Sequence, residues 1–172
     1  MIVPKSLRCL GLGALALAAV LLAGCSPKEI TPLERKQGAN FASEAAFAAN
    51  LRDFARAEGL LAQAVAVCPD TTEYWISLGT VRRKLDNRAG SRDAFKEALK
   101  AARATQRRAP TNSQAVIQEA YLLALLGQDD DARSTLEKAR RDRPDDRTIR
   151  LFVENKELDR LLADPGFKDL KP

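Results

Sequence analysis

The feature that most constrains this chain is an internal repeat with a period of 34 residues. Ala45 precedes Gly79 by 34 positions, and Leu61 precedes Phe95 by the same distance. The next step is 41 residues, from Gly79 to Ala120. A fixed period in this range is typical of stacked units, each too small to bury its apolar face alone. The sequence therefore predicts a chain of three similar units in which one unit is seven residues longer.

The register resembles the tetratricopeptide repeat, a helix–turn–helix unit of 34 residues. Three copies lie between residues 38 and 146. The positions that carry the resemblance are Phe41, Ala45, Ala57, Leu61, Ala64 and Pro69 in the first copy, Trp75, Leu78, Gly79, Ser91, Phe95 and Ala98 in the second, and Ala120, Ala132, Leu136, Ala139 and Pro144 in the third. The resemblance implies an all-α fold: a right-handed superhelical stack of antiparallel helix pairs, with three repeats and a partial C-terminal capping unit.

The boundaries of the expected helices fit this register. Thr31–Glu34 has the pattern of a capping box, with a proline at the first helical position. Asp53, Asn87 and Asp129 stand where the second helix of each pair begins, and we expect them to be N-caps. Gly127 suits a left-handed residue at a helix C-terminus.

The seven extra residues lie between Ser91 and Pro110, and no proline or glycine occurs from Ser91 to Ala109. The simplest interpretation is a second helix that is longer by about two turns, or roughly 10 Å. The alternative is an unstructured loop.

The chain after residue 146 predicts a partial fourth unit whose helix breaks near Asn155. We expect the helical repeat domain to span residues 32–163 and a C-terminal tail to span 164–172. Phe167 and Leu170 are the apolar residues of this tail, and we expect them to fold back over the last groove.

The N-terminus has the pattern of an export signal. Lys5 and Arg8 precede an uncharged apolar stretch from Leu10 to Ala23, and these 14 residues are too few to cross a bilayer, which needs about 20. The segment ends at Leu22–Cys25, which resembles the bacterial lipobox. The alternative is an ordinary signal peptide that happens to be followed by a cysteine.

The lipobox resemblance implies that residues 1–24 are a cleaved lipoprotein signal peptide and that Cys25 carries the lipid. Residues 25–31 then form a short tether, and several acyl chains give a stable membrane anchor. Ser26 follows the cysteine, which by resemblance points to the outer membrane, with the chain facing the periplasm.

Composition argues against catalysis. The sequence contains no histidine, which is the commonest general base and metal ligand. It also lacks a phosphate-binding glycine loop, a nucleophile elbow and spaced cysteine pairs for zinc. We therefore expect no enzymatic activity, no cofactor and no metal. Cys68 is the one cysteine left after the signal peptide and Cys25, and we expect a buried thiol, with intermolecular pairing as the alternative.

The resemblance also implies a concave groove made by the first helix of each pair. The predicted groove positions are Glu73, Ile76, Thr80, Arg83 and Lys84 in the second unit and Gln114, Ile117, Gln118 and Tyr121 in the third. Their apolar floor and cationic edge suit a helix or an extended peptide with acidic character. The alternative is a solvated or half-packed face without a partner.

A second candidate surface is basic, because residues 82–108 hold ten Lys or Arg and three Asp or Glu. Five cations recur at helical spacing on one face: Arg92, Lys96, Lys100, Arg103 and Arg107. No aromatic residues alternate with them, so we do not expect nucleic-acid binding. Anionic lipid headgroups or a cell-wall polymer are the candidate ligands, and a solvated helix face is the alternative.

The sequence thus predicts a lipid-anchored scaffold of the bacterial cell envelope that binds a protein or peptide partner through its groove. By resemblance, such lipoproteins serve envelope assembly, secretion or pilus biogenesis. The competing hypothesis is an envelope protein that binds anionic headgroups or polymer through the basic face of the helix expected at 88–109.

Overall fold

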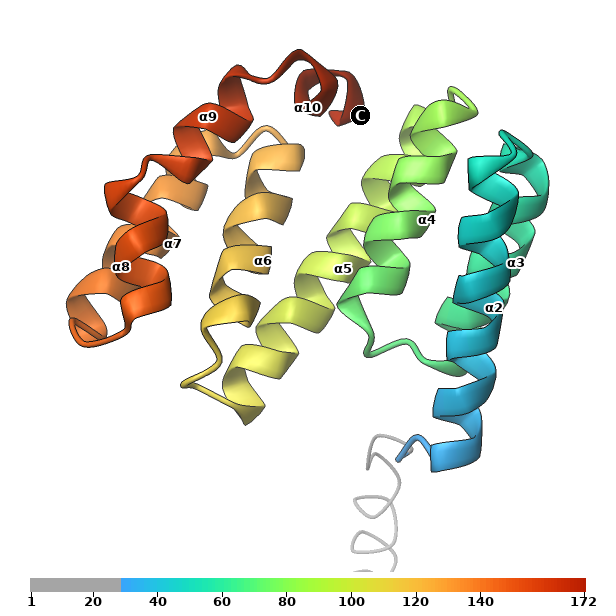
Figure 1. Cartoon of the computed structure of the whole chain (residues 1–172), viewed down its shortest axis with the longest axis horizontal. Helices are drawn as coiled ribbons and strands as arrows, with labels where there is room; N and C mark the ends of the chain where they lie inside the picture. Colours follow the sequence, from blue (N-terminus) through green and yellow to red (C-terminus); the bar gives the residue numbers. More distant parts are fainter. Residues whose placement is uncertain (1–28) are drawn as a thin grey trace, which may run out of the picture. The chain divides into compact units, whose positions relative to one another are not determined.

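The computed structural model describes residues 29–172, and its compact folded unit runs from Thr31 to Pro172. The predicted signal peptide, the lipobox and Cys25 lie outside the described residues. The described part of the chain contains nine α-helices and no strand (Figure 1). In chain order they are α2 (Pro32–Asn50), α3 (Phe54–Val67), α4 (Thr72–Lys84), α5 (Arg88–Arg108), α6 (Ser113–Leu125), α7 (Asp129–Asp142), α8 (Arg147–Glu154), α9 (Glu157–Ala163) and α10 (Pro165–Leu170).

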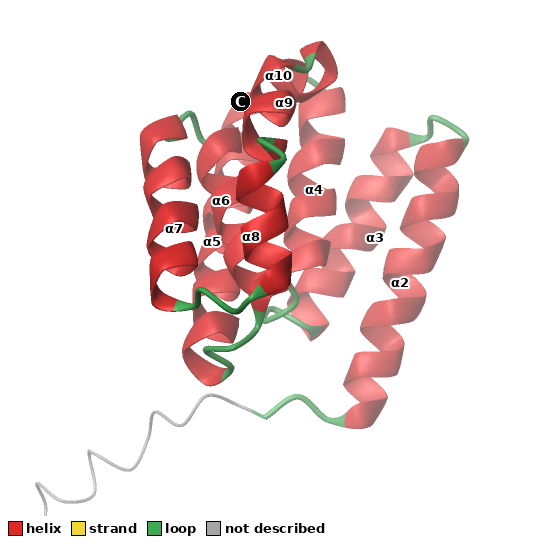
Figure 2. Ribbon diagram, turned by 60° about the vertical axis from the view of Figure 1, so that its left-hand side comes forward, coloured by secondary structure: helices red, strands yellow, loops and turns green. Residues whose placement is uncertain are grey.

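The helices pack as neighbours in chain order, which confirms the predicted all-α repeat class. The closest pairs are α2 with α3, α4 with α5, and α6 with α7, and each pair is joined by a short reversing turn (Figure 2). The second helix of one pair packs against the first helix of the next, as α3 does on α4 and α5 on α6.

The turns inside the three pairs repeat the same backbone geometry. Arg52, Asp86 and Gly127 each adopt a positive φ, of 61°, 58° and 78°. In each turn the next residue donates its N–H to a carbonyl five positions earlier, at 2.9 Å in all three cases. This is the hydrogen bond that closes a Schellman-type helix end. The prediction for Gly127 is confirmed, while the two non-glycine turns show that the left-handed position belongs to the repeat.

Most of the predicted N-caps are confirmed. Thr31 and Glu34 form a reciprocal capping box, with the Thr31 N–H donating to Glu34 Oε2 at 2.8 Å. Asp53 accepts from the Arg56 N–H at 3.1 Å, and Asn87 accepts from the Gly90 N–H at 2.9 Å.

The N-cap prediction for Asp129 is wrong. Gln128 occupies the cap position of α7 without a side-chain hydrogen bond, and Asp129 is the first helical residue. Three consecutive aspartates occupy this first turn, where a negative charge is favourable without capping. The Asp129 carboxylate instead accepts two hydrogen bonds from Lys171.

The seven-residue insertion is helical, so the longer-helix interpretation is confirmed and the loop alternative is wrong. Helix α5 has 21 residues, whereas α3 and α7, its counterparts in the other pairs, have 14 each.

The core is narrow at the crossing inside each pair. Ala57, Ser91 and Ala132, the small residues of the repeat register on the second helices, are fully buried. A Cβ atom on Gly79 would lie 2.4 Å from Cε1 of Phe95, so a side chain at this position requires the aromatic ring to move. The absence of a side chain at Gly79 therefore lets α4 approach the Phe95 ring of α5 closely.

The C-terminal unit breaks where the sequence predicts. Helix α8 ends at Glu154 with Asn155 as its C-cap, and Lys156 follows with a φ of 54°. Asp164 then ends α9 and caps α10 by accepting from the Phe167 N–H at 2.9 Å. The tail is therefore a short helix, and Phe167 is only 4% exposed.

Candidate functional site: the shared face of α4 and α6

The first helices of the second and third pairs present a common surface, which we call the α4/α6 face. It consists of the predicted groove positions Glu73, Ile76, Thr80 and Arg83 on α4 and Gln114, Ile117, Gln118 and Tyr121 on α6. Gln118 Nε2 donates to Glu73 Oε1 at 2.6 Å, so side chains 45 positions apart in the sequence meet directly.

Apolar side chains line this face beside the polar contact. Ile76, Ile117 and Tyr121 are partly buried and pack on the same hydrophobic cluster. Thr80 is half-buried, whereas Gln114 is exposed. The face therefore offers a partly exposed apolar floor with a hydrogen-bonded amide and carboxylate at the end where α4 begins.

The cationic end of the face is already engaged by the chain itself. Arg83 Nε donates to the Lys171 backbone carbonyl at 3.2 Å, and an Arg83 Nη1 atom lies 3.5 Å from the Asp86 carboxylate. Lys84, the other predicted cation of the groove, is exposed.

The aromatic residue of the face is covered by the tail. The Tyr121 and Phe167 rings meet edge to face, with 5.4 Å between their centroids and 63° between their planes. Burial raises the pKa of the Tyr121 phenol because the charged phenolate loses solvation. The structure thus places all nine predicted positions on α4 and α6, and the C-terminal segment covers one end of the surface.

The predicted basic face lies along α5, but most of its cations have partners within the chain. Lys96 lies 3.5 Å from Asp93, and Lys100 lies 3.3 Å from Glu97, both one turn earlier on the same helix. The remaining members are Arg92, which donates to the Pro172 carbonyl at 3.0 Å, Arg103, which pairs with Glu119, and Arg107, which is exposed.

The Arg103–Glu119 pair was missed by sequence reasoning. Glu119 is only 8% exposed and accepts from Arg103 Nε at 2.7 Å. A buried carboxylate needs such a partner, because an unpaired charge in the interior is strongly unfavourable. The available signal was an acidic residue at a repeat position that usually holds leucine, combined with an arginine in the inserted part of α5.

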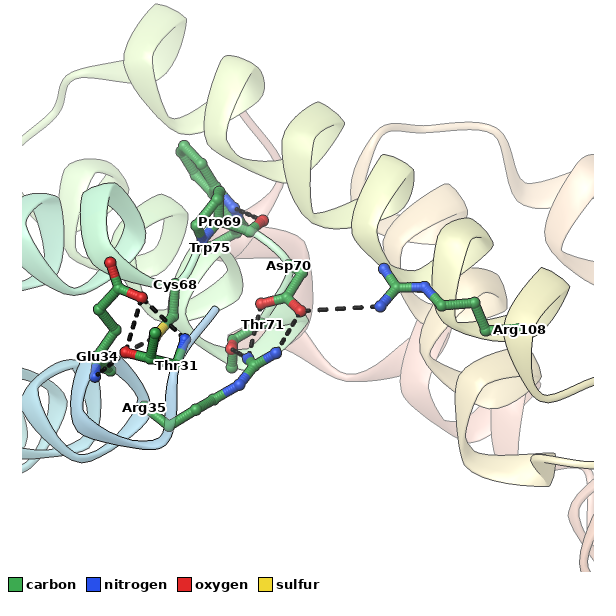
Figure 3. Close-up of polar contacts among 9 residues, drawn as sticks. All are labelled: Thr31, Glu34, Arg35, Cys68, Pro69, Asp70, Thr71, Trp75 and Arg108. Atoms are coloured by element: carbon green, nitrogen blue, oxygen red, sulfur yellow. Dashed lines mark hydrogen bonds and ion pairs between the residues drawn. The ribbon is translucent and has the colours of Figure 1, made fainter. Parts of the chain in front are cut away.

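A second polar cluster joins the first helix pair to the second (Figure 3). The Arg35 guanidinium donates to both Asp70 oxygens, at 2.7 and 2.6 Å, and Arg108 lies 3.8 Å from the same carboxylate. The hydrogen bonds from Arg35 lower the pKa of the Asp70 carboxyl below its ordinary value. Thr71 is the N-cap of α4, and the Asp70 carboxylate just before it holds α2 and α5 to this turn.

Cys68 lies beside this cluster and is buried, as predicted. Its Sγ donates to the Glu34 backbone carbonyl at 3.4 Å, and desolvation raises the pKa of the thiol. Gly38 leaves room for the sulfur, because a Cβ atom there would lie 2.7 Å from Sγ. Nearby, Trp75 of α4 donates its indole N–H to the Pro69 carbonyl at 2.8 Å. These contacts fit a structural role at the joint between pairs.

Within residues 29–172, no cluster of three or more carboxylate, cysteine or histidine side chains is placed to hold a metal ion. None of the helices in this part of the chain is both long and apolar enough to cross a membrane. Comparison with protein-family models and with curated proteins finds no match to this chain.

Proposed function

We propose that this chain is a lipid-anchored tetratricopeptide scaffold of the bacterial cell envelope that binds a protein or peptide partner. In this proposal the helix pairs form a right-handed superhelix, and the α4/α6 face is the wall of its concave groove. Envelope assembly, secretion and pilus biogenesis are the processes that the resemblance suggests.

The observation that carries the proposal is the meeting of α4 and α6. Gln118 and Glu73 are hydrogen-bonded across the two helices, and Ile76 and Ile117 lie partly exposed beside them. A partner helix or strand can bury these isoleucines while its polar groups bond to the amide and carboxylate.

The repeat assignment is supported by the backbone. The three left-handed residues Arg52, Asp86 and Gly127 are spaced by 34 and 41 positions, as the sequence repeats are. The recurrence of one turn geometry at those spacings is expected for copies of a single helix–turn–helix unit.

The anchor part of the proposal places the scaffold at the outer membrane, facing the periplasm. Six residues, from Ser26 to Thr31, separate the proposed lipidated Cys25 from the start of α2. Fully extended, six residues reach about 20 Å, so the first helix pair stays close to the bilayer surface. A partner is then itself associated with the membrane or delivered to it.

The basic-face hypothesis receives less support. Lys96 and Lys100 already face carboxylates on α5, and Arg103 neutralises the buried Glu119. Binding of an anionic surface through Arg103 would leave that carboxylate without its partner.

A site-specific crosslinking experiment tests the proposal. A photocrosslinking amino acid at Gln114, on the α4/α6 face, should capture a protein in cells that the same group at Lys96, on α5, does not. Binding of the purified partner should survive about 0.5 M salt, as expected for an apolar contact, and should weaken about tenfold in Ile76→Ala but not in Arg107→Ala. In the same cells, Cys25→Ser should move the chain from the membrane fraction to the soluble fraction.

Equal capture from both positions, or binding lost on adding salt and on Arg107→Ala, would instead favour the basic face. Retention of Cys25→Ser on membranes after salt and alkaline washes would place the anchor elsewhere.

A further inference from the structure

The C-terminal segment Asp164–Pro172 lies on four helices of two successive pairs. Its contacts reach Arg83 on α4, Arg92 on α5, Tyr121 on α6 and Asp129 on α7. Figure 1 shows the end of the chain beside the C-terminal ends of α4 and α6. We call the four contacted residues the tail seat.

The central contact is aromatic. Phe167 is 4% exposed and meets Tyr121 edge to face, an arrangement in which the positive edge of one ring faces the negative face of the other. Leu170, the other apolar side chain of the segment, is partly buried against the same hydrophobic cluster.

An ion pair and two hydrogen bonds to the backbone complete the contact of the segment with the tail seat. The Lys171 ammonium donates to both Asp129 oxygens, at 3.0 and 3.2 Å, and lies 5.9 Å from the centroid of the Phe167 ring. The two arginines of the seat, Arg83 and Arg92, donate to the backbone carbonyls of the last two residues. The seat thus recognises an aromatic side chain, a cation four residues later, and the adjoining backbone carbonyls.

The contacts of this segment are weak enough for another peptide segment to replace it. Helix α10 has six residues, and a helix of that length is not stable without tertiary contacts. The ion pair between Lys171 and Asp129 is partly exposed, at 28% and 42%, so water competes for it. The order of the segment therefore depends mainly on the buried aromatic ring.

The seat overlaps the surface proposed to bind a partner, because Arg83 and Tyr121 belong to the α4/α6 face. Within residues 29–172, the contacts of Asp164–Pro172 with this face fall at Arg83 and Tyr121, away from the Glu73–Gln118 hydrogen bond at its other end. A partner that extends along the whole face must displace the segment to reach Tyr121.

We propose that Asp164–Pro172 is an internal ligand, which fills a peptide-binding seat until a partner segment with the same aromatic-x-x-x-cation pattern replaces it. The inference rests on the proposed function, in that it concerns the same face, and it specifies the chemistry of the partner. The segment limits binding to partners that supply both the ring for Tyr121 and the cation for Asp129.

The test uses the full chain, purified in detergent, and a fluorescein-labelled peptide of residues 164–172, Asp-Pro-Gly-Phe-Lys-Asp-Leu-Lys-Pro. Fluorescence anisotropy measures peptide binding to the wild type and to Phe167→Ala, whose own segment is released. We expect Phe167→Ala to bind the peptide at least tenfold more tightly than the wild type. The same peptide with alanine in place of phenylalanine should not bind.

A second variant covers the risk that Phe167→Ala perturbs the fold. Lys171→Glu places an acidic group against Asp129 and weakens the segment without touching the core, so it should also bind the peptide more tightly than the wild type. Lys168→Ala is the matched control, because Lys168 is an exposed cation of the same helix, and it should behave like the wild type. Circular dichroism confirms that each variant is folded.

Equal peptide binding by the wild type and both variants, or no binding to a folded Lys171→Glu, would overturn the inference. A wild-type dimer that Lys171→Glu dissociates would also overturn it, because a second copy would then fill the seat. Crosslinking from Gln114 does not depend on this result, so the proposed function can survive failure of the internal-ligand inference.

Discussion

The two ends of the repeat domain differ in how much of their large apolar side chains is exposed to solvent. At the N-terminal end, α2 and the turn after it leave three large apolar side chains largely exposed: Leu33 at 75%, Phe47 at 63% and Leu51 at 65%. At the C-terminal end, Ile149 is fully buried and Phe167 is 4% exposed. A stack of repeats leaves an unmatched face at each end, and terminal units normally cover it or make it polar.

The difference arises from the helices that adjoin each end of the described chain. Helices α8, α9 and α10 are short, at eight, seven and six residues, and they fold over the last full pair. Helix α2 has α3 as its close partner, and its buried residues are small, namely Gly38, Ala45 and Ala48. The C-terminal end is therefore built with large side chains and the N-terminal end with a thin, alanine-rich contact.

The largest predicted difference between the two ends is in the free energy of unfolding lost when a phenylalanine at each end is replaced by alanine. Phe167→Ala should lower the free energy of unfolding by about 3 kcal/mol, because it removes a buried ring from the core. Phe47→Ala removes the same atoms from an exposed position and should change it by less than about 0.5 kcal/mol. Denaturant unfolding followed by circular dichroism measures both. A large loss from Phe47→Ala would show that its ring is covered in the intact protein.

A pair of glycine substitutions sharpens the contrast between a helix crossing and an open helix surface. Gly79→Ala places a Cβ atom 2.4 Å from the Phe95 ring and should destabilise the fold by about 1–3 kcal/mol through overpacking. Gly59, inside α3, has open space where a Cβ atom would lie, with no atom within 4 Å apart from its chain neighbours and its own helix backbone, so Gly59→Ala should stabilise by about 0.5–1 kcal/mol. Thermal melts of both variants measure the opposite shifts. A common direction of shift would contradict the assigned crossing.

The smallest predicted effect concerns the polar joint that holds the first pair. The Arg35 guanidinium lowers the pKa of Asp70, so its stabilising contribution is present above the unfolded-state pKa of about 3.9 and is lost as pH falls through the lower folded-state value. Because Arg35 is 46% exposed, the contribution is about 1 kcal/mol at most. Asp70→Asn should therefore be less stable than the wild type at about pH 6, with a difference that narrows below about pH 4. A difference that persists unchanged at about pH 2 would point to a cause other than the charge.

Local sequence signals predicted the helices well. The capping box at Thr31 and Glu34, the caps Asp53 and Asn87, and the left-handed Gly127 are each defined within a few residues, and each is present. The inserted turns of α5 also followed from local information, since no helix-breaking residue occurs in them.

Long-range polar pairing was not predictable in the same way. Asp70 lies just before the N-cap of α4, but Arg35 and Arg108 approach it from 35 and 38 positions away and bind its carboxylate. Asp129 has the pattern of a cap, but Lys171 binds its carboxylate. In both cases a distant cation competes with a local backbone N–H, and only the packing of the helices brings that cation within reach.

The sequence predicted on which helices the candidate site lies, but it did not predict that the C-terminal segment would cover Tyr121. Repeat register alone placed Ile76, Ile117 and Tyr121 on the first helices of two adjacent units. The contact of Phe167 with Tyr121 depends on the breaks at Asn155 and Asp164, which set the direction of the last helices. The sequence predicts such breaks, but the angles between the helices on either side of them depend on packing.

Helix α5, at 21 residues, is about 31 Å long and belongs to both hydrophobic clusters of the domain. Ala94 packs in the cluster of the first two pairs, and the next residue, Phe95, packs in the cluster that extends to α10. In a linear array of repeats, each unit can melt separately unless neighbouring units share structure. Loss of α5 opens both clusters together, so this helix couples the melting of the first pair to that of the last, and the domain should unfold as one cooperative block.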